Sequence, residues 1–248
     1  MKNVLSYSFS TITIASLLLA PAVLCAQSRA YPEDFTERER RIADALKSAL
    51  DLIAVQRKPA AKTVLYGINE TYPHDQRVTL ILAELEMHEK KWQSALDLLM
   101  TSKFEKDVDG GERYIRVGYL MTKVRRFKEA REMWDPGLVI RGGFPETTKM
   151  LPDIKTVKGL EAGWLLAFAY RANVTLTGGF DTKKMFEGVL ALDPGNPLAA
   201  GDLAGRALNE RQWRAALHYS ELALKRCPPG SYRKIYENRR TKALAMLR

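Results

Sequence analysis

The sequence has few of the residues that most often carry out chemistry. Its 248 residues include only three histidines and two cysteines. None of the histidines (His74, His88 and His218) has a second ligand at the spacing typical of a zinc site. A glycine-rich phosphate loop and a Gly-x-Ser-x-Gly nucleophile motif are both absent from the sequence. We therefore expect no enzymatic activity, no metal, no cofactor and no small-molecule substrate.

Long hydrophobic runs are also scarce. The one candidate, residues 12–24, follows Lys2 and is broken by two hydroxyl residues and a proline. It is shorter than the roughly 20 apolar residues that a transmembrane helix needs. A positive start before a short apolar core is typical of a secretory signal peptide. We interpret residues 1–26 as a signal peptide cleaved near Ala26 and expect an exported protein, periplasmic or secreted.

The leader and the cysteines leave alternatives open. Cleavage could follow Ala22, because Ala20 and Ala22 form an A-x-A pattern. Lipidation of Cys25 could instead anchor the chain to a membrane, although the residues before it match the usual pattern poorly. Once the leader is removed, Cys227 has no intramolecular partner, so helix packing must replace disulfides. We expect Cys227 to be a core residue at a helix end, with a free reactive thiol as the alternative.

A pattern of alanine and tryptophan recurs along the chain. A Leu-Ala pair is followed nine residues after its alanine by a Trp, and three residues later by an Ala-Leu pair. The two clearest copies are Leu82-Ala83, Trp92 and Ala95-Leu96, and then Leu203-Ala204, Trp213 and Ala216-Leu217. Pro194 and Pro228, which lie 34 residues apart, each close a unit. Such fixed intervals predict a repeat architecture.

The repeated residues have a mechanical role in paired helices. Small residues let two antiparallel helices approach closely, and an aromatic residue at the turn fills the gap between hairpins. The units are residues 42–75, 76–109 and 111–144 (repeats 1–3, within 42–144), and then 163–196 and 197–230 (repeats 4–5, within 163–230). The pattern resembles the tetratricopeptide repeat family. This resemblance implies an all-α fold, a right-handed α-solenoid of about five helical hairpins, closed by a capping helix over residues 231–248.

Two segments fall outside the repeats. Residues 27–41 are polar and predict a linker and the start of a helix, with Thr36 as N-cap and Glu39 completing a capping box. Residues 135–160 are dense in glycine and proline, so we expect a connecting loop over 145–162, between the third and fourth hairpins. A loop of this length could contact a partner or could be a tolerated insertion.

The charge balance is basic, with a formal net charge of +10 at pH 7. A basic surface can attract nucleic acid, anionic envelope polymers, lipid headgroups or acidic proteins. Export argues against nucleic acid as the partner. Binding to an anionic polymer or membrane surface, through the basic residues of 231–248, therefore stands as an alternative function, and solvated helix faces account for the charge without any ligand.

The resemblance also implies a binding groove, because in this family the first helix of each hairpin lines the concave face. The corresponding residues are Arg77, Glu84, His88, Arg116, Tyr119, Lys123, Trp164 and Arg171. Cations mixed with aromatics suit a peptide with acidic and apolar groups, although ordinary exposed helix residues could show the same mixture. Leu46 and Leu50 stand where carboxylate-clamp members of the family carry Lys and Asn, so binding of that kind is not expected. The sequence thus favours an exported, non-enzymatic scaffold that binds an envelope protein or peptide.

Overall fold

The structure is a computed structural model that describes residues 33–101, 110–138, 145–171 and 180–248. The chain divides into two compact units, residues 1–40 and 41–248. The described part of the first unit is helical, and in it the Nε of Arg40 donates a 2.9 Å hydrogen bond to Glu37. The predicted signal peptide, including Cys25, lies outside the described residues. The features below belong to the second unit unless stated otherwise.

All regular structure in the described ranges is helical. The α-helices are α1 (Glu33–Ala54), α2 (Lys58–Thr71), α3 (Gln76–His88), α4 (Trp92–Thr101), α5 (Gly110–Lys123), α6 (Phe127–Glu132), α7 (Val157–Arg171), α8 (Thr182–Leu192), α9 (Pro197–Asn209), α10 (Trp213–Arg226) and α11 (Ser231–Ala245). Two short 3₁₀ segments, η3 (Pro136–Leu138) and η4 (Pro145–Met150), lie between α6 and α7.

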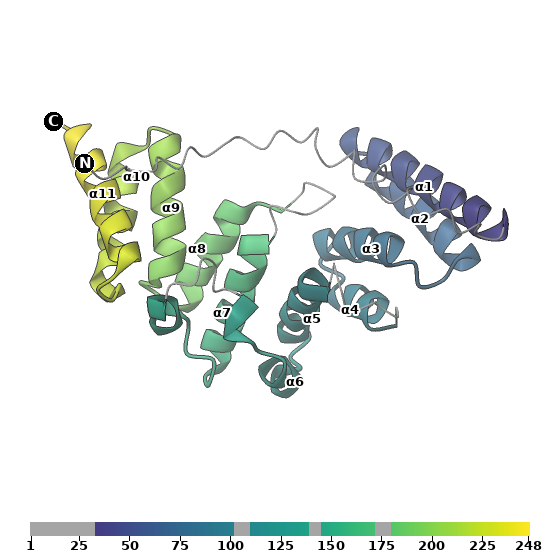
Figure 1. Cartoon of the computed structure of the whole chain (residues 1–248), viewed down its shortest axis with the longest axis horizontal. Helices are drawn as coiled ribbons and strands as arrows, with labels where there is room; N and C mark the ends of the chain where they lie inside the picture. The colour runs from purple at the N-terminus through teal and green to yellow at the C-terminus, as the bar shows by residue number, and fades with distance from the viewer. Residues whose placement is uncertain (1–32, 102–109, 139–144, 172–179) are drawn as a thin grey trace, which may run out of the picture. The chain divides into compact units, whose positions relative to one another are not determined.

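The helices of the second unit follow one another in chain order (Figure 1). Successive helices pair into hairpins, as α3 does with α4, α7 with α8 and α9 with α10, and each hairpin packs on the next. The last helix, α11, packs on both α9 and α10. The described helices thus form an all-α solenoid of five hairpins closed by a capping helix, as predicted. Its right-handed sense stays a prediction.

The same backbone turn joins the first and second helices of four hairpins. A non-glycine residue with a φ between 59° and 64° stands in each turn, at Gln56, Lys90, Arg125 and Arg211. The residue that follows donates its N–H back into the first helix, as Lys91 does to the Glu86 carbonyl at 3.0 Å. This is the Schellman arrangement, which satisfies the last carbonyls of a helix. Its recurrence indicates that these hairpins are copies of one structural unit.

The repeated alanines and the repeated tryptophans differ in how deeply they are buried. Ala95 and Ala216 are fully buried, as the close approach of paired helices requires. Trp92 and Trp213 begin α4 and α10, but both are only half-buried. Each indole is the first residue of a second helix, so it lies at the surface end of its hairpin. Trp92 still packs inward, meeting Tyr119 edge-on with ring centroids 6.3 Å apart.

A different indole occupies the centre of the core. Trp164 of α7 is fully buried, and its Nε1 donates a 3.0 Å hydrogen bond to the carbonyl of Ala130 in α6. Trp134 packs edge-on against it with ring centroids 5.2 Å apart. Gly118 of α5 faces the same indole so closely that any side chain there would clash with the ring. This one residue therefore joins α5, α6 and α7.

The segment that precedes α7 reaches the end of the chain. The Glu146 carboxylate accepts the N–H of Ser231, the first residue of α11, at 2.7 Å. The Met150 carbonyl accepts a 3.1 Å hydrogen bond from the side chain of Asn196, the N-cap of α9. The thioether of Met150 lies 3.8 Å from the sulfur of Cys227 at the end of α10. These contacts fasten η4 to the starts of α9 and α11.

We call residues 145–156 the strap, and they differ from the expected connecting loop over 145–162. Helix α7 begins at Val157, so the end of that range is helical. The helix starts there because the Thr156 hydroxyl accepts the N–H of Gly159 at 3.0 Å, as an N-cap does. The strap bonds to α9 and α11 of the same chain, which makes it a structural brace.

Two other expectations concern helix ends. Cys227 is buried at the C-terminus of α10, as predicted, and burial raises the pKa of its thiol. At the N-terminus, α1 already includes Thr36, so the prediction that this residue caps the helix was wrong. The helix begins instead at Glu33, three residues before Thr36. Among the helices the structure describes, none combines the length and apolar character of a membrane span.

Candidate functional site

The helices that open successive hairpins contact one another side by side. Glu84 of α3 forms an ion pair with Arg116 of α5, and the Arg116 guanidinium lies 5.7 Å from the ring centre of Phe168 in α7. The Tyr170 hydroxyl of α7 donates a 2.7 Å hydrogen bond to Asp202 of α9, and α9 packs on α11. We call the row α3, α5, α7, α9 and α11 the first-helix wall.

Four of the predicted groove residues are buried inside this wall, namely Glu84, Arg116, Tyr119 and Trp164. Glu84 and Arg116 are 0% and 1% exposed, so their charges hold α3 to α5. Their assignment as partner-contacting residues was wrong. Neighbouring first helices lie so close that side chains pointing along the wall are enclosed by the next helix.

Of the other four, Arg77 is exposed, and His88, Lys123 and Arg171 are half-buried. His88, Lys123 and Arg171 are the last residues of α3, α5 and α7, where positive charge interacts favourably with the helix dipole. We call these three residues the cationic edge. Arg77 lies apart from them, near the start of α3, where its Nη2 is 2.8 Å from the carboxylate of Asp75.

Aromatic rings connect the cationic edge. The imidazole of His88 stacks on Phe180 with ring centroids 4.3 Å apart, and Phe180 meets Phe168 at 5.0 Å. Phe168 in turn lies 5.0 Å from Tyr119. The ammonium of Lys123 stands over the Tyr119 ring, 5.0 Å from its centroid. Phe168 and Tyr119 are buried, so the half-buried rings of His88 and Phe180, beside the two cations, are the aromatic groups that remain at the surface.

Two of these rings were not among the predicted groove residues. Phe168 follows Trp164 by one helical turn, a spacing that could have placed it on the same face. Phe180 matched the repeat pattern, but nothing in the sequence indicates that it reaches α3, which lies about 90 residues earlier in the chain.

The charge state of the cationic edge follows from its surroundings. Burial, and secondarily the charge of Lys58, lowers the pKa of His88, so the imidazole is neutral at pH 7. Burial raises the pKa of Tyr119 to about 12, so the phenol is also neutral. The edge therefore carries the charges of Lys123 and Arg171. The Nε of Arg171 is buried and has no hydrogen-bond partner in the part of the chain that is described.

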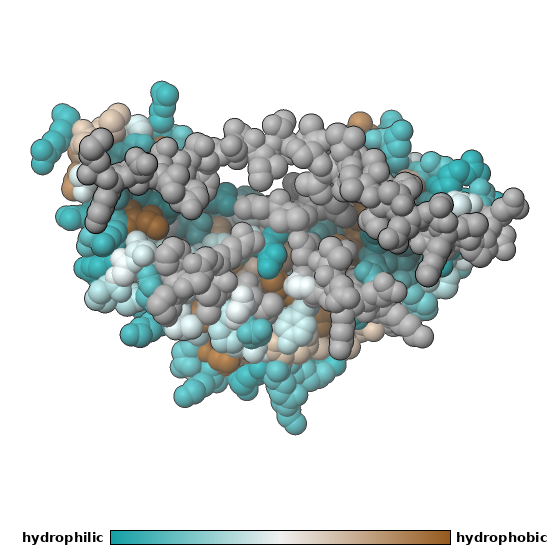
Figure 2. All heavy atoms as spheres, in the orientation of Figure 1, coloured by the Kyte–Doolittle hydropathy of each residue, from teal (hydrophilic) through white to brown (hydrophobic). Residues whose placement is uncertain are grey.

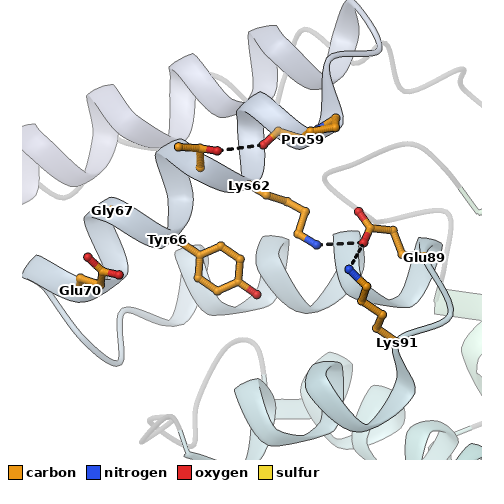
Figure 3. Close-up of a pocket in the computed structure, with 8 residues that line it drawn as sticks. Pro59, Lys62, Tyr66, Gly67, Glu70, Glu89 and Lys91 are labelled. Atoms are coloured by element: carbon orange, nitrogen blue, oxygen red, sulfur yellow. Dashed lines mark hydrogen bonds and ion pairs between the residues drawn. The ribbon is translucent and has the colours of Figure 1, made fainter.

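A cleft of about 630 Å³ lies between α2 and the turn from α3 to α4 (Figure 3). Lys62 and Lys91 converge there on Glu89, at 3.0 and 2.7 Å. Lys62 also lies 2.6 Å from Glu86, which accepts a 2.8 Å hydrogen bond from the Tyr66 hydroxyl. Burial alone would lower the pKa of Lys62, but these carboxylates outweigh it and raise the pKa. Both lysines are thus neutralised internally, which leaves this cleft little charge for a ligand.

The exposed surface offers no large apolar area in the described ranges. The exposed large hydrophobic residues are Val55, Met100, Val157, Ile235, Met246 and Leu247. They come from several separate elements. On the one face that Figure 2 draws, the described residues left visible between the grey atoms are mostly hydrophilic, with some brown areas among them. A broad exposed hydrophobic patch, of the kind that marks many interfaces, is therefore not found among the described residues. Within the described ranges, no three or more His, Cys, Asp or Glu residues are grouped to hold a metal ion.

The geometry thus defines an all-α array of stacked helical hairpins with a first-helix wall. Comparison with known proteins found no matching family model and no matching curated protein. Among solved structures, the chain is similar to Pseudomonas aeruginosa PilF, with 15% identity over 85% of this chain and 92% of that one and a TM-score of 0.38. It is also similar to PilW, described as a widely conserved type IV pilus biogenesis factor, with 17% identity over 83% and 91% and a TM-score of 0.37.

Proposed function

We propose that the protein is a non-enzymatic scaffold that binds a protein or peptide partner on the cationic edge of its first-helix wall. The observation that carries this proposal is the position of His88, Lys123 and Arg171 at the ends of three successive first helices, beside stacked aromatic rings. Acidic groups of a partner would meet the two cations, and its apolar groups would meet the rings. Arg77, near the start of α3 and apart from the edge, is a separate candidate contact.

The proposal places this partner in the cell envelope. The support is the predicted signal peptide over residues 1–26, which also underlies the proposal of a periplasmic or secreted protein. Anchoring through Cys25 remains the alternative to a freely diffusing mature chain.

The test uses the full chain with an affinity tag in its native host. The double variant Lys123→Glu plus Arg171→Glu reverses the charge of the cationic edge. Arg116 is left unchanged, because its burial would turn a binding test into a folding test. The matched control is Lys128→Glu plus Arg214→Glu, which makes the same change in net charge at exposed residues of the second helices α6 and α10.

Proteins recovered from the envelope fraction are quantified by mass spectrometry. We expect a partner that is recovered with the wild type and the control and is lost with the edge variant. Equal recovery with all three proteins, each folded by circular dichroism, would contradict the proposal.

A further inference from the structure

Another cleft, of about 450 Å³, lies between α9 and α11 at the C-terminal end of the first-helix wall. Its walls carry three cations, Arg206 from α9 and Arg239 and Lys242 from α11. The amide of Asn209 adds a neutral hydrogen-bonding group. Asp202 is the acidic residue of the lining, and it already accepts the hydroxyl hydrogen bond of Tyr170.

The three cations have no carboxylate within ion-pair distance in the described ranges, in contrast to Lys62, Arg116 and Arg226 elsewhere in the unit. Arg206 lies over the ring of Phe186 instead, 5.5 Å from its centroid. Like charges gathered around one cleft repel each other. An anion in the cleft would remove that cost.

The position of Arg239 is built into the fold. Its Nη1 donates a hydrogen bond to the carbonyl of Gly201, and its guanidinium lies 5.9 Å from the ring centre of Tyr236. A Cβ atom on Gly205 would stand 3.1 Å from that guanidinium, so the absence of a side chain there lets the group lie against α9. The cation is therefore held in place before any ligand arrives, which lowers the entropic cost of binding.

The repeat explains why this cleft is open. Gly205 precedes Trp213 by eight residues, just as Glu84 precedes Trp92. In α3 this position supplies the carboxylate that pairs with Arg116 of the next first helix. In α9 the same position is Gly205, which has no side chain to pair with Arg239 of the next helix. The Arg239 guanidinium therefore has N–H groups left to donate to a ligand.

We propose that this cleft binds a phosphate group. A phosphate monoester carries about −1.5 to −2 charges at pH 7 and three strong acceptor oxygens. It therefore matches three cations better than a single carboxylate does. Planar guanidinium groups bind such oxygens in pairs, and the ammonium of Lys242 adds a mobile point charge. The phosphate could belong to a small soluble compound or to a lipid headgroup, and this chemistry is common to both.

The first experiment measures saturable binding by NMR. Inorganic phosphate is titrated into the ¹⁵N-labelled mature chain at constant ionic strength, with sulfate and chloride as reference anions. We expect saturable amide shifts confined to α9 and α11. In the variant Arg206→Gln plus Lys242→Gln, we expect affinity to fall about tenfold or more, as the loss of charge-assisted hydrogen bonds implies. Arg239 is not replaced, because it also supports the packing of α11.

The matched control is Arg214→Gln plus Lys225→Gln, which removes the same two charges from exposed positions of α10. The control should bind phosphate as the wild type does. Equal weakening in both double variants, or shifts that never saturate, would overturn the proposal in favour of diffuse attraction to net charge.

A second variant tests geometry at constant charge. Gly205→Ala places a methyl group against the Arg239 guanidinium, which must then move by a few tenths of an ångström. We expect phosphate affinity to fall several-fold while the melting temperature stays near that of the wild type. Unchanged affinity would contradict a built site.

Further arms identify the source of the phosphate and test the main competitor. Flotation with phosphatidylcholine vesicles, with and without phosphatidic acid, reports on a monoester lipid headgroup, whereas phenyl phosphate reports on small soluble monoesters. Tighter binding of either phosphate probe than of chloride and acetate supports the proposal. A hexaglutamate peptide that binds the cleft more tightly than every phosphate probe would overturn it in favour of an acidic segment. The cleft shares no residue with the cationic edge, so the failure of either proposal leaves the other standing.

Discussion

Among the described residues, charged side chains between neighbouring first helices are ion-paired at one end of the first-helix wall and are not ion-paired at the other. Between α3 and α5, Glu84 and Arg116 are buried and neutralise each other. Between α9 and α11, Arg206 and Arg239 face an open cleft, and no carboxylate of the described residues, Asp202 of the lining included, lies within ion-pair distance of them. The architecture is the same, and the difference arises where a glutamate in one repeat is replaced by Gly205 in another. A repeat fold can thus use one position either to lock neighbouring helices or to leave a cation available.

The largest expected effect on stability comes from breaking the ion pair between α3 and α5. Glu84→Ala leaves the buried guanidinium of Arg116 without its carboxylate, and we expect a loss of about 3–5 kcal/mol in the free energy of unfolding. Urea denaturation followed by circular dichroism measures this loss.

The double variant Glu84→Leu plus Arg116→Met serves as the control, because apolar side chains of similar size remove both charges at once. It should be more stable than Glu84→Ala. A single variant as stable as the wild type would show that the pair does not hold α3 to α5.

The next largest effect is expected where α11 packs on α9. A methyl group on Gly201 would overlap the ring of Tyr236, so Gly201→Ala should cost about 1–3 kcal/mol by overpacking. Gly67 of α2 is the matched control, because nothing lies within 4 Å of a Cβ atom built there. Gly67→Ala should stabilise the protein by about 0.5–1 kcal/mol through helix propensity. Opposite signs in thermal melts are expected, and equal signs would contradict the packing described for α11.

A pH titration sharpens the comparison at the cationic edge. The folded-state pKa of His88 is lowered by burial and by Lys58, so the unfolded chain binds a proton more readily. Stability should therefore fall as the pH drops below about 6.5, the ordinary value for histidine, toward the lower folded value. His88→Phe keeps an aromatic ring against Phe180 and should lose this dependence. Identical pH profiles of the melting temperature in the two proteins would show that His88 does not contribute.

The smallest effect lies in the repeated turns. Lys90 has a φ of 59°, a left-handed conformation that glycine adopts without a Cβ penalty. Lys90→Gly should stabilise the protein by about 0.5 kcal/mol, and Arg211→Gly should do the same in the last hairpin. Differential scanning calorimetry measures the change, and destabilisation of both variants would contradict the turn geometry.

The sequence predicted the architecture well, because the repeat is recorded in local spacing. Paired alanines such as Ala95 and Ala216 mark close helix approaches, and the tryptophans mark where second helices begin. The buried pair of Glu84 and Arg116 could not be found in this way. Charged residues are mostly exposed, and the two side chains lie 32 residues apart in the chain.

The site was harder to predict than the fold. His88, Lys123 and Arg171 do lie on first helices, α3, α5 and α7, as the sequence predicted. Which side chains of these helices remain accessible depends on the distance between neighbouring helices, and the sequence does not give that distance. The cleft beside α11 depends on a missing side chain at Gly205, and a helical glycine by itself indicates close packing as readily as an open cleft. No local pattern indicated that Glu146 would reach Ser231, because such a contact follows only from the assembled array.

The strap changes how this array should come apart. Repeat proteins whose units contact only their neighbours can fray from an end, one unit at a time. Here the hydrogen bond from Ser231 to Glu146 closes a loop of 85 residues, so the C-terminal helices cannot open without releasing the segment before α7. In native-state hydrogen exchange, amide protons of α7 to α11 should accordingly exchange as a single cooperative foldon.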